Sequence, residues 1–249
     1  ASNPVRRVDL WLQRNGAFEN IGGPDMGLIL EAETRRGIVD ALTKNEMLAD
    51  AVAAPDAIRR QEDDDEEIDV VIRIGKTIIV GEVKCLLYPT EASERYDHIT
   101  KIEQAAAQAN RKAIWLSDNS DRLISAIGPL PCPSEQLSYQ PMVILNHGAG
   151  LGLVVGDAIV TDRHFLTLFL ESNTFVANAA VRYEDKRTGT LTKTLYKSAA
   201  DAEARLREIF SDPPGLMPFK NAARWRTVQF PTSSGESLQV FAPYLDADA

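Results

Sequence analysis

The stretch IDVVIRIGKTIIVGEVKC, residues 68–85, decides the fold. Its two runs of β-branched residues are separated by Gly75 and Lys76, a pair suited to a tight turn, so the stretch predicts an antiparallel hairpin. Because side chains alternate between the two faces of a strand, Glu82 and Lys84 share one face at the end of the second run. The strand reads as buried up to this point, and a protein interior rarely takes up ionised groups without partners. The two charges therefore need an explanation.

The predicted hairpin places Asp69 directly opposite Glu82, since Asp69 lies six residues before Gly75 and Glu82 lies six residues after Lys76. Opposed residues have Cβ atoms about 4.5–5.5 Å apart, and like charges at this distance repel each other. A divalent cation between the two carboxylates would remove the repulsion, and Mg²⁺ prefers carboxylate and carbonyl oxygens together with water. The residues thus predict a Mg²⁺ site, with Mn²⁺ able to substitute, formed by Asp69, Glu82 and the Val83 carbonyl.

Lys84 would complete this site. Its ammonium group lies on the same strand face as Glu82, where it would position or help to deprotonate a water molecule acidified by the metal. A plain surface ion pair between Glu82 and Lys84, worth under about 1 kcal/mol, is the simpler alternative. That alternative leaves the opposition of Asp69 and Glu82 without a reason.

The motif Asp69…Glu82-Val83-Lys84, set in a helix–strand–strand–helix order, resembles the PD-(D/E)XK nuclease superfamily. This superfamily places an Asp on one strand and the (D/E)xK triplet on the next, and Ile68 stands here in place of its nominal Pro. The resemblance implies the restriction-endonuclease-like fold, an α/β fold with an αβββαβ core and a mixed central sheet.

The resemblance covers roughly residues 25–172 and implies two further catalytic residues. The family often has a Glu on the helix before the sheet, where Glu31 fits and Glu33 is its rival. It also often has a Gln on the following helix, where Gln108 is favoured over Gln104.

Apolar periodicity predicts the elements that surround the hairpin. We expect helices over 25–44, 96–119, 121–128 and 163–173, and further strands over 139–147 and 157–162. Interleaved helices and strands of this kind indicate the α/β class. The expected parts of the chain are an N-terminal lead-in over 1–24, the nuclease-like core over 25–173 and a C-terminal α+β extension or subdomain over 174–249.

The net charge of −9 argues against a general nucleic-acid coat, but the charge is unevenly distributed. The run EDDDEE over 62–67 predicts a solvated loop, whereas residues 181–230 carry an excess of basic side chains. Basic side chains can contact phosphates and supply affinity without sequence information. The candidate nucleic-acid contacts are Lys101, Arg111, Lys112, Lys193, Lys197, Arg224 and Arg226.

Further features concern the location of the protein. The sequence has no apolar run of about 18 residues, so no membrane partner is expected. Its N-terminus lacks the apolar stretch of a signal peptide, and its two cysteines form neither a disulfide framework nor a zinc motif. These features favour a reducing, cytoplasmic location. The first residue is not Met, which favours a piece cut from a larger protein.

The family resemblance implies a Mg²⁺-dependent endonuclease that hydrolyses phosphodiester bonds of DNA within a larger defence or repair protein. A homodimer is expected if both strands are cut, although no residue points to it. Two alternatives stay open. The fold could be an inactive module that docks nucleic acid or protein, which the acidic composition favours, or it could be a metal-dependent hydrolase of RNA or nucleotides.

Overall fold

The computed structural model describes residues 24–59, 67–182, 187–217, 220, 223–231 and 237–245, to which all structural statements below refer. The chain divides into two compact units, Ala1–Ser211 and Asp212–Ala249. Most of the expected lead-in over 1–24 and most of the acidic run over 62–67 lie outside the described residues.

A six-stranded mixed sheet forms the centre of the first unit. Its strands are β1 Val52–Ala53, β4 Val70–Ile74, β5 Thr77–Lys84, β6 Ser138–Leu145, β7 Val154–Val155 and β8 Ala158–Asp162. They follow the order β1-β4-β5-β6-β8-β7. The strands β5, β6 and β8 run parallel, while β4 is antiparallel to β5 and each edge strand is antiparallel to its neighbour. The α/β class with a mixed central sheet is therefore confirmed.

The hairpin of β4 and β5 has the predicted register. Its ladder begins with Val70 opposite Gly81, and Gly75 closes the turn with a φ of +59°. Asp69 directly precedes the first pair of this ladder on one strand, and Glu82 directly follows it on the other. The two acidic residues are thus opposed, as the sequence predicts.

Gly81 lets three neighbouring strands pack closely. A Cβ atom at this position would lie 2.7 Å from Ile144 Cδ1 on β6 and 3.0 Å from Val70 Cβ on β4. The glycine that opens the GEVKC stretch therefore serves the core on one face of β5, while Glu82 points to the other face.

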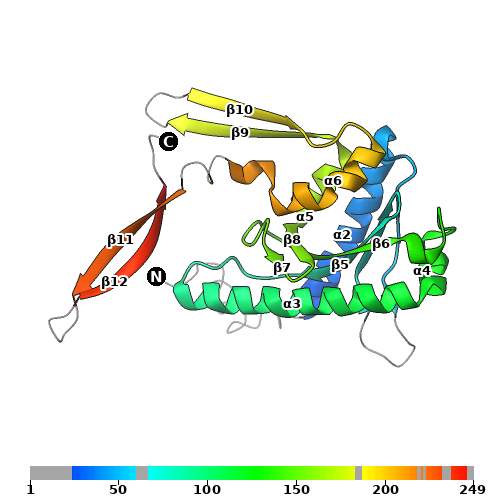
Figure 1. Ribbon diagram of the computed structural model, residues 1–249, viewed down its shortest axis with the longest axis horizontal. Coiled ribbons are helices and arrows are strands. Elements are labelled where there is room, and N and C mark those ends of the chain that lie inside the picture. Colours follow the sequence, from blue (N-terminus) through cyan, green and yellow to red (C-terminus); the bar gives the residue numbers. More distant parts are fainter. Residues whose placement is uncertain are drawn as a thin grey trace, which may run out of the picture. The chain divides into compact units, whose positions relative to one another are not determined.

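Helices cover both faces of the sheet, as Figure 1 shows. They are α2 Pro24–Lys44, α3 Ala92–Asp118, α4 Ser120–Ile127, α5 Arg163–Glu171 and α6 Ala199–Ser211. Core residues of α2, α5 and α6 cluster with one sheet face, and those of α3 and α4 cluster with the other face. Within the described part of the chain, no helix combines the length and the apolar character needed to cross a membrane. Short elements complete the unit: the 3₁₀ helices η1 Glu46–Leu48 and η2 Ser134–Gln136, and the paired strands β2 Ile58–Arg59 and β3 Glu67–Ile68.

The long helix α3 carries a buried face of small side chains. Ala105, Ala106 and Ala109 are fully buried, and Ala105 and Ala106 cluster with Val143 of β6 and Val160 of β8. Residues spaced three and four apart share one face of a helix, so these alanines form a stripe along α3. Small side chains allow close approach, and a long polar side chain in the same stripe can therefore reach the strands.

The first unit extends beyond residue 173, where the sequence predicted the core to end. The strands β9 Thr174–Arg182 and β10 Arg187–Thr194 form a hairpin after α5, and α6 then packs against the sheet. Ala202, Leu206 and Phe210 of α6 are buried in the same cluster as α2 and α5. The compact unit consequently ends at Ser211, because the apolar face of α6 is part of this core.

Tyr196, just after β10, anchors the returning chain. Its hydroxyl group donates a hydrogen bond to the Phe169 carbonyl at 2.7 Å and accepts one from Asn45 Nδ2, also at 2.7 Å. The same Asn45 amide donates to the Leu170 carbonyl at 2.9 Å. These bonds satisfy buried polar groups and join segments from three parts of the sequence.

The second unit contains a hairpin of β11 Ala223–Pro231 and β12 Ser237–Leu245, which follows the 3₁₀ helix η3 Pro214–Leu216. The expected α+β extension is thus divided, since β9, β10 and α6 belong to the first unit, whereas η3 and the hairpin of β11 and β12 belong to the second.

We predict that Phe210→Ala lowers the free energy of unfolding by about 3–5 kcal/mol, because it opens a cavity in the main core. Phe210 is fully buried, and its ring lies 4.9 Å from that of Phe169. The matched control Tyr96→Ala removes an aromatic ring that is 75% exposed and should cost under about 0.5 kcal/mol. Urea unfolding measures both variants, and equal small losses would show that α6 is not part of the core.

Candidate active site

Asp69 and Glu82 meet at the end of the hairpin, and both are buried, with exposed fractions of 5% and 3%. One carboxylate oxygen of Asp69, Oδ2, accepts a hydrogen bond from the Val83 backbone N–H at 2.7 Å. Arg35 of α2 donates to the Asp69 backbone carbonyl at 2.9 Å. The position of Asp69 is therefore held from both β5 and α2.

A lysine of α3 bridges the two carboxylates. Lys112 Nζ lies 3.3 Å from Asp69 Oδ1 and forms an ion pair with Glu82 Oε2. Burial lowers the pKa of Lys112, but the two carboxylates outweigh it, so the net pKa lies above the ordinary value and the ammonium is charged. A buried charge of this kind is tolerated only with partners.

Lys112 was predicted to contact phosphates, and the structure corrects this expectation. Only 4% of the residue is exposed, so its ammonium group is not available on the surface. The sequence does contain a signal that would have found it. Lys112 lies seven residues after Ala105, three after Ala109 and four before Leu116, so it falls within the apolar stripe of α3. A charge in such a stripe predicts a buried partner.

Lys84 forms the outer side of the site. Its Nζ lies 2.6 Å from Glu82 Oε1, and its side chain is 33% exposed, whereas that of Glu82 is only 4% exposed. Lys84 thus pairs with a buried carboxylate while its own ammonium also meets solvent. The Glu82–Lys84 neighbourhood on one strand face is as predicted.

Glu31 belongs to the same electrostatic environment. Its pKa is raised to about 7, first by burial and then by the negative charges of Asp69, Glu67 and Glu82, while Arg35 lowers it. The rival Glu33 instead pairs with Arg163 at 2.8 Å.

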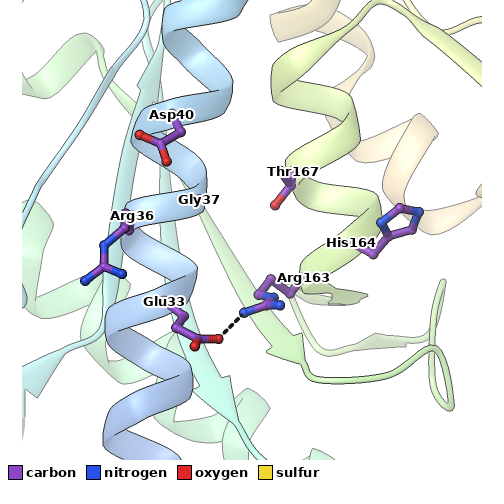
Figure 2. Close-up of a pocket in the computed structure, with 7 residues that line it drawn as sticks. All are labelled: Glu33, Arg36, Gly37, Asp40, Arg163, His164 and Thr167. Atoms are coloured by element: carbon purple, nitrogen blue, oxygen red, sulfur yellow. Dashed lines mark hydrogen bonds and ion pairs between the residues drawn. The ribbon is translucent and has the colours of Figure 1, made fainter.

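Figure 2 shows this Glu33–Arg163 pair in a pocket of about 380 Å³ between α2 and α5. The other lining residues include Arg36, Asp40 and His164, and neither Asp69 nor Glu82 is among them. The structure therefore favours Glu31 over Glu33 as the glutamate of the candidate site.

Asp69 also lies in an environment with excess negative charge. Its pKa is raised to about 6, first by burial and then by Glu82, although Lys112 and the Val83 N–H lower it. The lysine bridge consequently offsets only part of the cost of placing these carboxylates together.

The donor set fits a hard divalent cation with few protein ligands. Mg²⁺ commonly uses one or two carboxylates and keeps several waters, which matches the opposed oxygens of Asp69 and Glu82. No group of three or more His, Cys, Asp or Glu side chains within the described ranges is close enough to hold a metal ion. The third predicted ligand is the Val83 carbonyl. The contact observed for Val83 involves its other backbone group, the N–H, which donates a hydrogen bond to Asp69.

The helix α3 carries both candidate glutamines. Gln108 is half-buried and precedes Lys112 by one helical turn, so the two residues share a face of α3, whereas Gln104 is exposed. This placement agrees with the preference for Gln108. On the same helix, Lys101 and Arg111 are exposed.

The remaining predicted phosphate contacts lie on other elements. Lys193 is half-buried on β10, and Lys197 is exposed directly before α6. Arg224 and Arg226 are exposed on β11 of the second unit.

Two histidines pack near the carboxyl end of β6. The rings of His98 and His147 are stacked with centroids 5.3 Å apart, and His98 Nε2 lies 2.8 Å from the Ala149 carbonyl oxygen. Burial, followed by His98, lowers the pKa of His147. His147 is therefore neutral at neutral pH and serves the packing of α3 against the loop after β6.

No protein-family model, curated protein or solved structure matches the chain. The likeness to PD-(D/E)XK nucleases consequently depends on the residues described above.

We predict that Glu31→Gln raises stability more at about pH 8 than at about pH 5, with a difference of about 1–2 kcal/mol. Because the folded-state pKa of Glu31 is raised to about 7, its stabilising contribution is present at low pH and is lost as the pH rises to that value. The magnitude allows for the partial exposure of Glu31. Urea unfolding at both pH values measures the effect.

Glu33→Gln is the matched control, since it changes an exposed glutamate of the same helix. It removes only a surface ion pair, worth under about 1 kcal/mol. If both variants showed the same pH dependence, the electrostatic assignment of Glu31 to the carboxylate cluster would be wrong.

Proposed function

We propose that this chain is a metal-dependent nuclease of the PD-(D/E)XK type that hydrolyses phosphodiester bonds of DNA. The observation that carries the proposal is the opposition of Asp69 and Glu82 across the β4–β5 hairpin, with Lys84 beside Glu82. The motif of the superfamily requires this arrangement. A charge-paired strand end alone would not require two opposed buried carboxylates.

Asp69 and Glu82 would hold the metal ion. When bound, Mg²⁺ or Mn²⁺ supplies charge stabilisation at the phosphate and lowers the pKa of a water molecule. The Val83 N–H fixes the orientation of the Asp69 carboxylate through Oδ2, while Oδ1 accepts a hydrogen bond from Lys112.

Lys84 and Glu31 would handle water and protons. The partly exposed Lys84 ammonium can hold a water molecule beside Glu82 and offset negative charge on the scissile phosphate. Glu31, with a pKa of about 7, can accept or release a proton near neutral pH, which is the range suited to general acid–base catalysis. Gln108 would orient the water or the substrate backbone from α3.

DNA would be bound through exposed basic side chains, among which Lys101 and Arg111 lie on the same helix as Lys112. Because the net charge is −9, we propose that this binding is weak and sensitive to salt. A second copy of the chain for double-strand cleavage and a larger parent protein are part of the same proposal.

One observation favours a second candidate, the inactive docking module. Lys112 already bridges Asp69 and Glu82, so the carboxylates have a counter-ion without any metal. A module of this kind would bind nucleic acid or protein without dependence on divalent cations.

We predict that the protein cleaves DNA in Mg²⁺ or Mn²⁺ but not in EDTA, and that Glu82→Gln and Lys84→Met each reduce the rate by about 100-fold or more. The reason is that each variant removes a charge that touches the metal or the reacting water. Supercoiled, linear and single-stranded DNA, with RNA as a comparison, are incubated with each protein and analysed on gels. The circular substrate separates endonuclease from exonuclease action.

Matched controls are Glu103→Gln, an exposed glutamate of α3, and Lys76→Met, at the opposite end of β5. Both should cleave like the wild type. If all proteins are folded and none cleaves, while DNA binding persists in EDTA, the docking module is the correct function. Faster cleavage of RNA than of DNA would favour the RNA-directed hydrolase.

A further inference from the structure

All four carboxylate oxygens of Asp69 and Glu82 accept hydrogen bonds or ion pairs from this chain. Asp69 Oδ2 accepts from the Val83 N–H and Oδ1 from Lys112, while Glu82 Oε2 pairs with Lys112 and Oε1 with Lys84. Any cation that enters must therefore replace at least one of these donors.

The three donors differ in how readily an incoming cation could displace them. The Val83 N–H is part of the β5 backbone and cannot leave. Lys84 contacts Glu82 alone among the two carboxylates, and its side chain is 33% exposed, so it can turn toward solvent. Lys112 is the donor that contacts both carboxylates, and it lies where a cation shared by them would bind.

We infer that Lys112 is an internal cation that holds Asp69 and Glu82 together before metal arrives, and that a divalent ion binds by displacing its ammonium group. This inference rests on the proposed function, because it concerns the same two carboxylates. Lys112 is thus a positioning residue that sets the metal concentration at which the site fills.

Displacement follows from space and charge. A Mg²⁺ ion shared by both carboxylates would need to approach an oxygen of each within direct coordination distance. The Lys112 ammonium contacts the same oxygens, and two cations at such separations repel strongly in a buried site. The four-carbon side chain of lysine is flexible, so its ammonium can move while α3 stays in place.

The direct test is the binding of Mn²⁺, measured by calorimetry at fixed pH for the wild type and for Lys112→Met. If the displaced state is populated at about 10% or less, removing the competing ammonium tightens Mn²⁺ binding about tenfold or more. Lys84→Met is the matched comparison, since it removes an equal charge that touches only Glu82. The gain for Lys112→Met should be the larger of the two.

A second measurement uses the wild-type protein and does not depend on the folding of a variant. Lysine side chains are acylated with a small amine-reactive ester, and modification is followed by mass spectrometry with and without saturating Mn²⁺. Lys112 is 4% exposed and should be protected in EDTA, whereas Mn²⁺ should raise its modification rate about tenfold or more. Lys76 serves as the reference, and its rate should not change.

The outcomes separate this inference from the nuclease proposal. If Mn²⁺ binds to the wild type, Lys112→Met is folded and binds no more tightly, and Lys112 stays protected, the inference is overturned while the nuclease stands. If Mn²⁺ binds more tightly to Lys112→Met than to the wild type, and the wild type cleaves no DNA, the inference is supported and the nuclease proposal is overturned. If neither the wild type nor folded Lys112→Met binds Mn²⁺, both fail.

Discussion

The structure depends on the cost of placing two carboxylates opposite each other in a buried position. Asp69 and Glu82 are held there by the Lys112 ammonium, by Lys84 and by the Val83 N–H. Removing one partner of such a group leaves an uncompensated buried charge, which is strongly destabilising. The packing of α3 on this sheet face and the close contact of β4, β5 and β6 both serve to keep the partners in reach.

The charges around the site are only partly balanced. Lys84, Lys112 and Arg35 lie among the carboxylates of Asp69, Glu82 and Glu31, yet the pKa values of Asp69 and Glu31 remain raised to about 6 and about 7. Burial is the first cause for both groups, so additional positive charge would be taken up favourably. The uncompensated negative charge is the physical basis for expecting a cation at this site. It persists although Lys112 already bridges the two carboxylates.

Local rules explain what could be predicted from the sequence. The turn at Gly75 fixed the hairpin register, and the register placed Asp69 opposite Glu82 without further information. The main helices followed from apolar periodicity in the same way. By contrast, the choice between Glu31 and Glu33 depends on which helix face approaches the sheet, and periodicity in α2 alone does not determine this.

Long-range packing explains what was missed. Lys112 lies forty-three residues after Asp69, and its role depends on how far α3 approaches the strands. The end of the core was placed too early, after residue 173, because the apolar face of α6 does not reveal what covers it. In both cases the information lies in a contact between elements that are distant in sequence.

The position of Lys112 in the alanine stripe has a consequence for the uniqueness of the fold. Similar small side chains repeat along α3, so apolar packing alone discriminates poorly between neighbouring docking positions of the helix. A slip of one turn would present Gln108 or Leu116 to the two carboxylates and would leave Lys112 without them. A single buried polar residue is known to set the register of paired helices in this manner. The ion pair thus selects one alignment of α3 on the sheet.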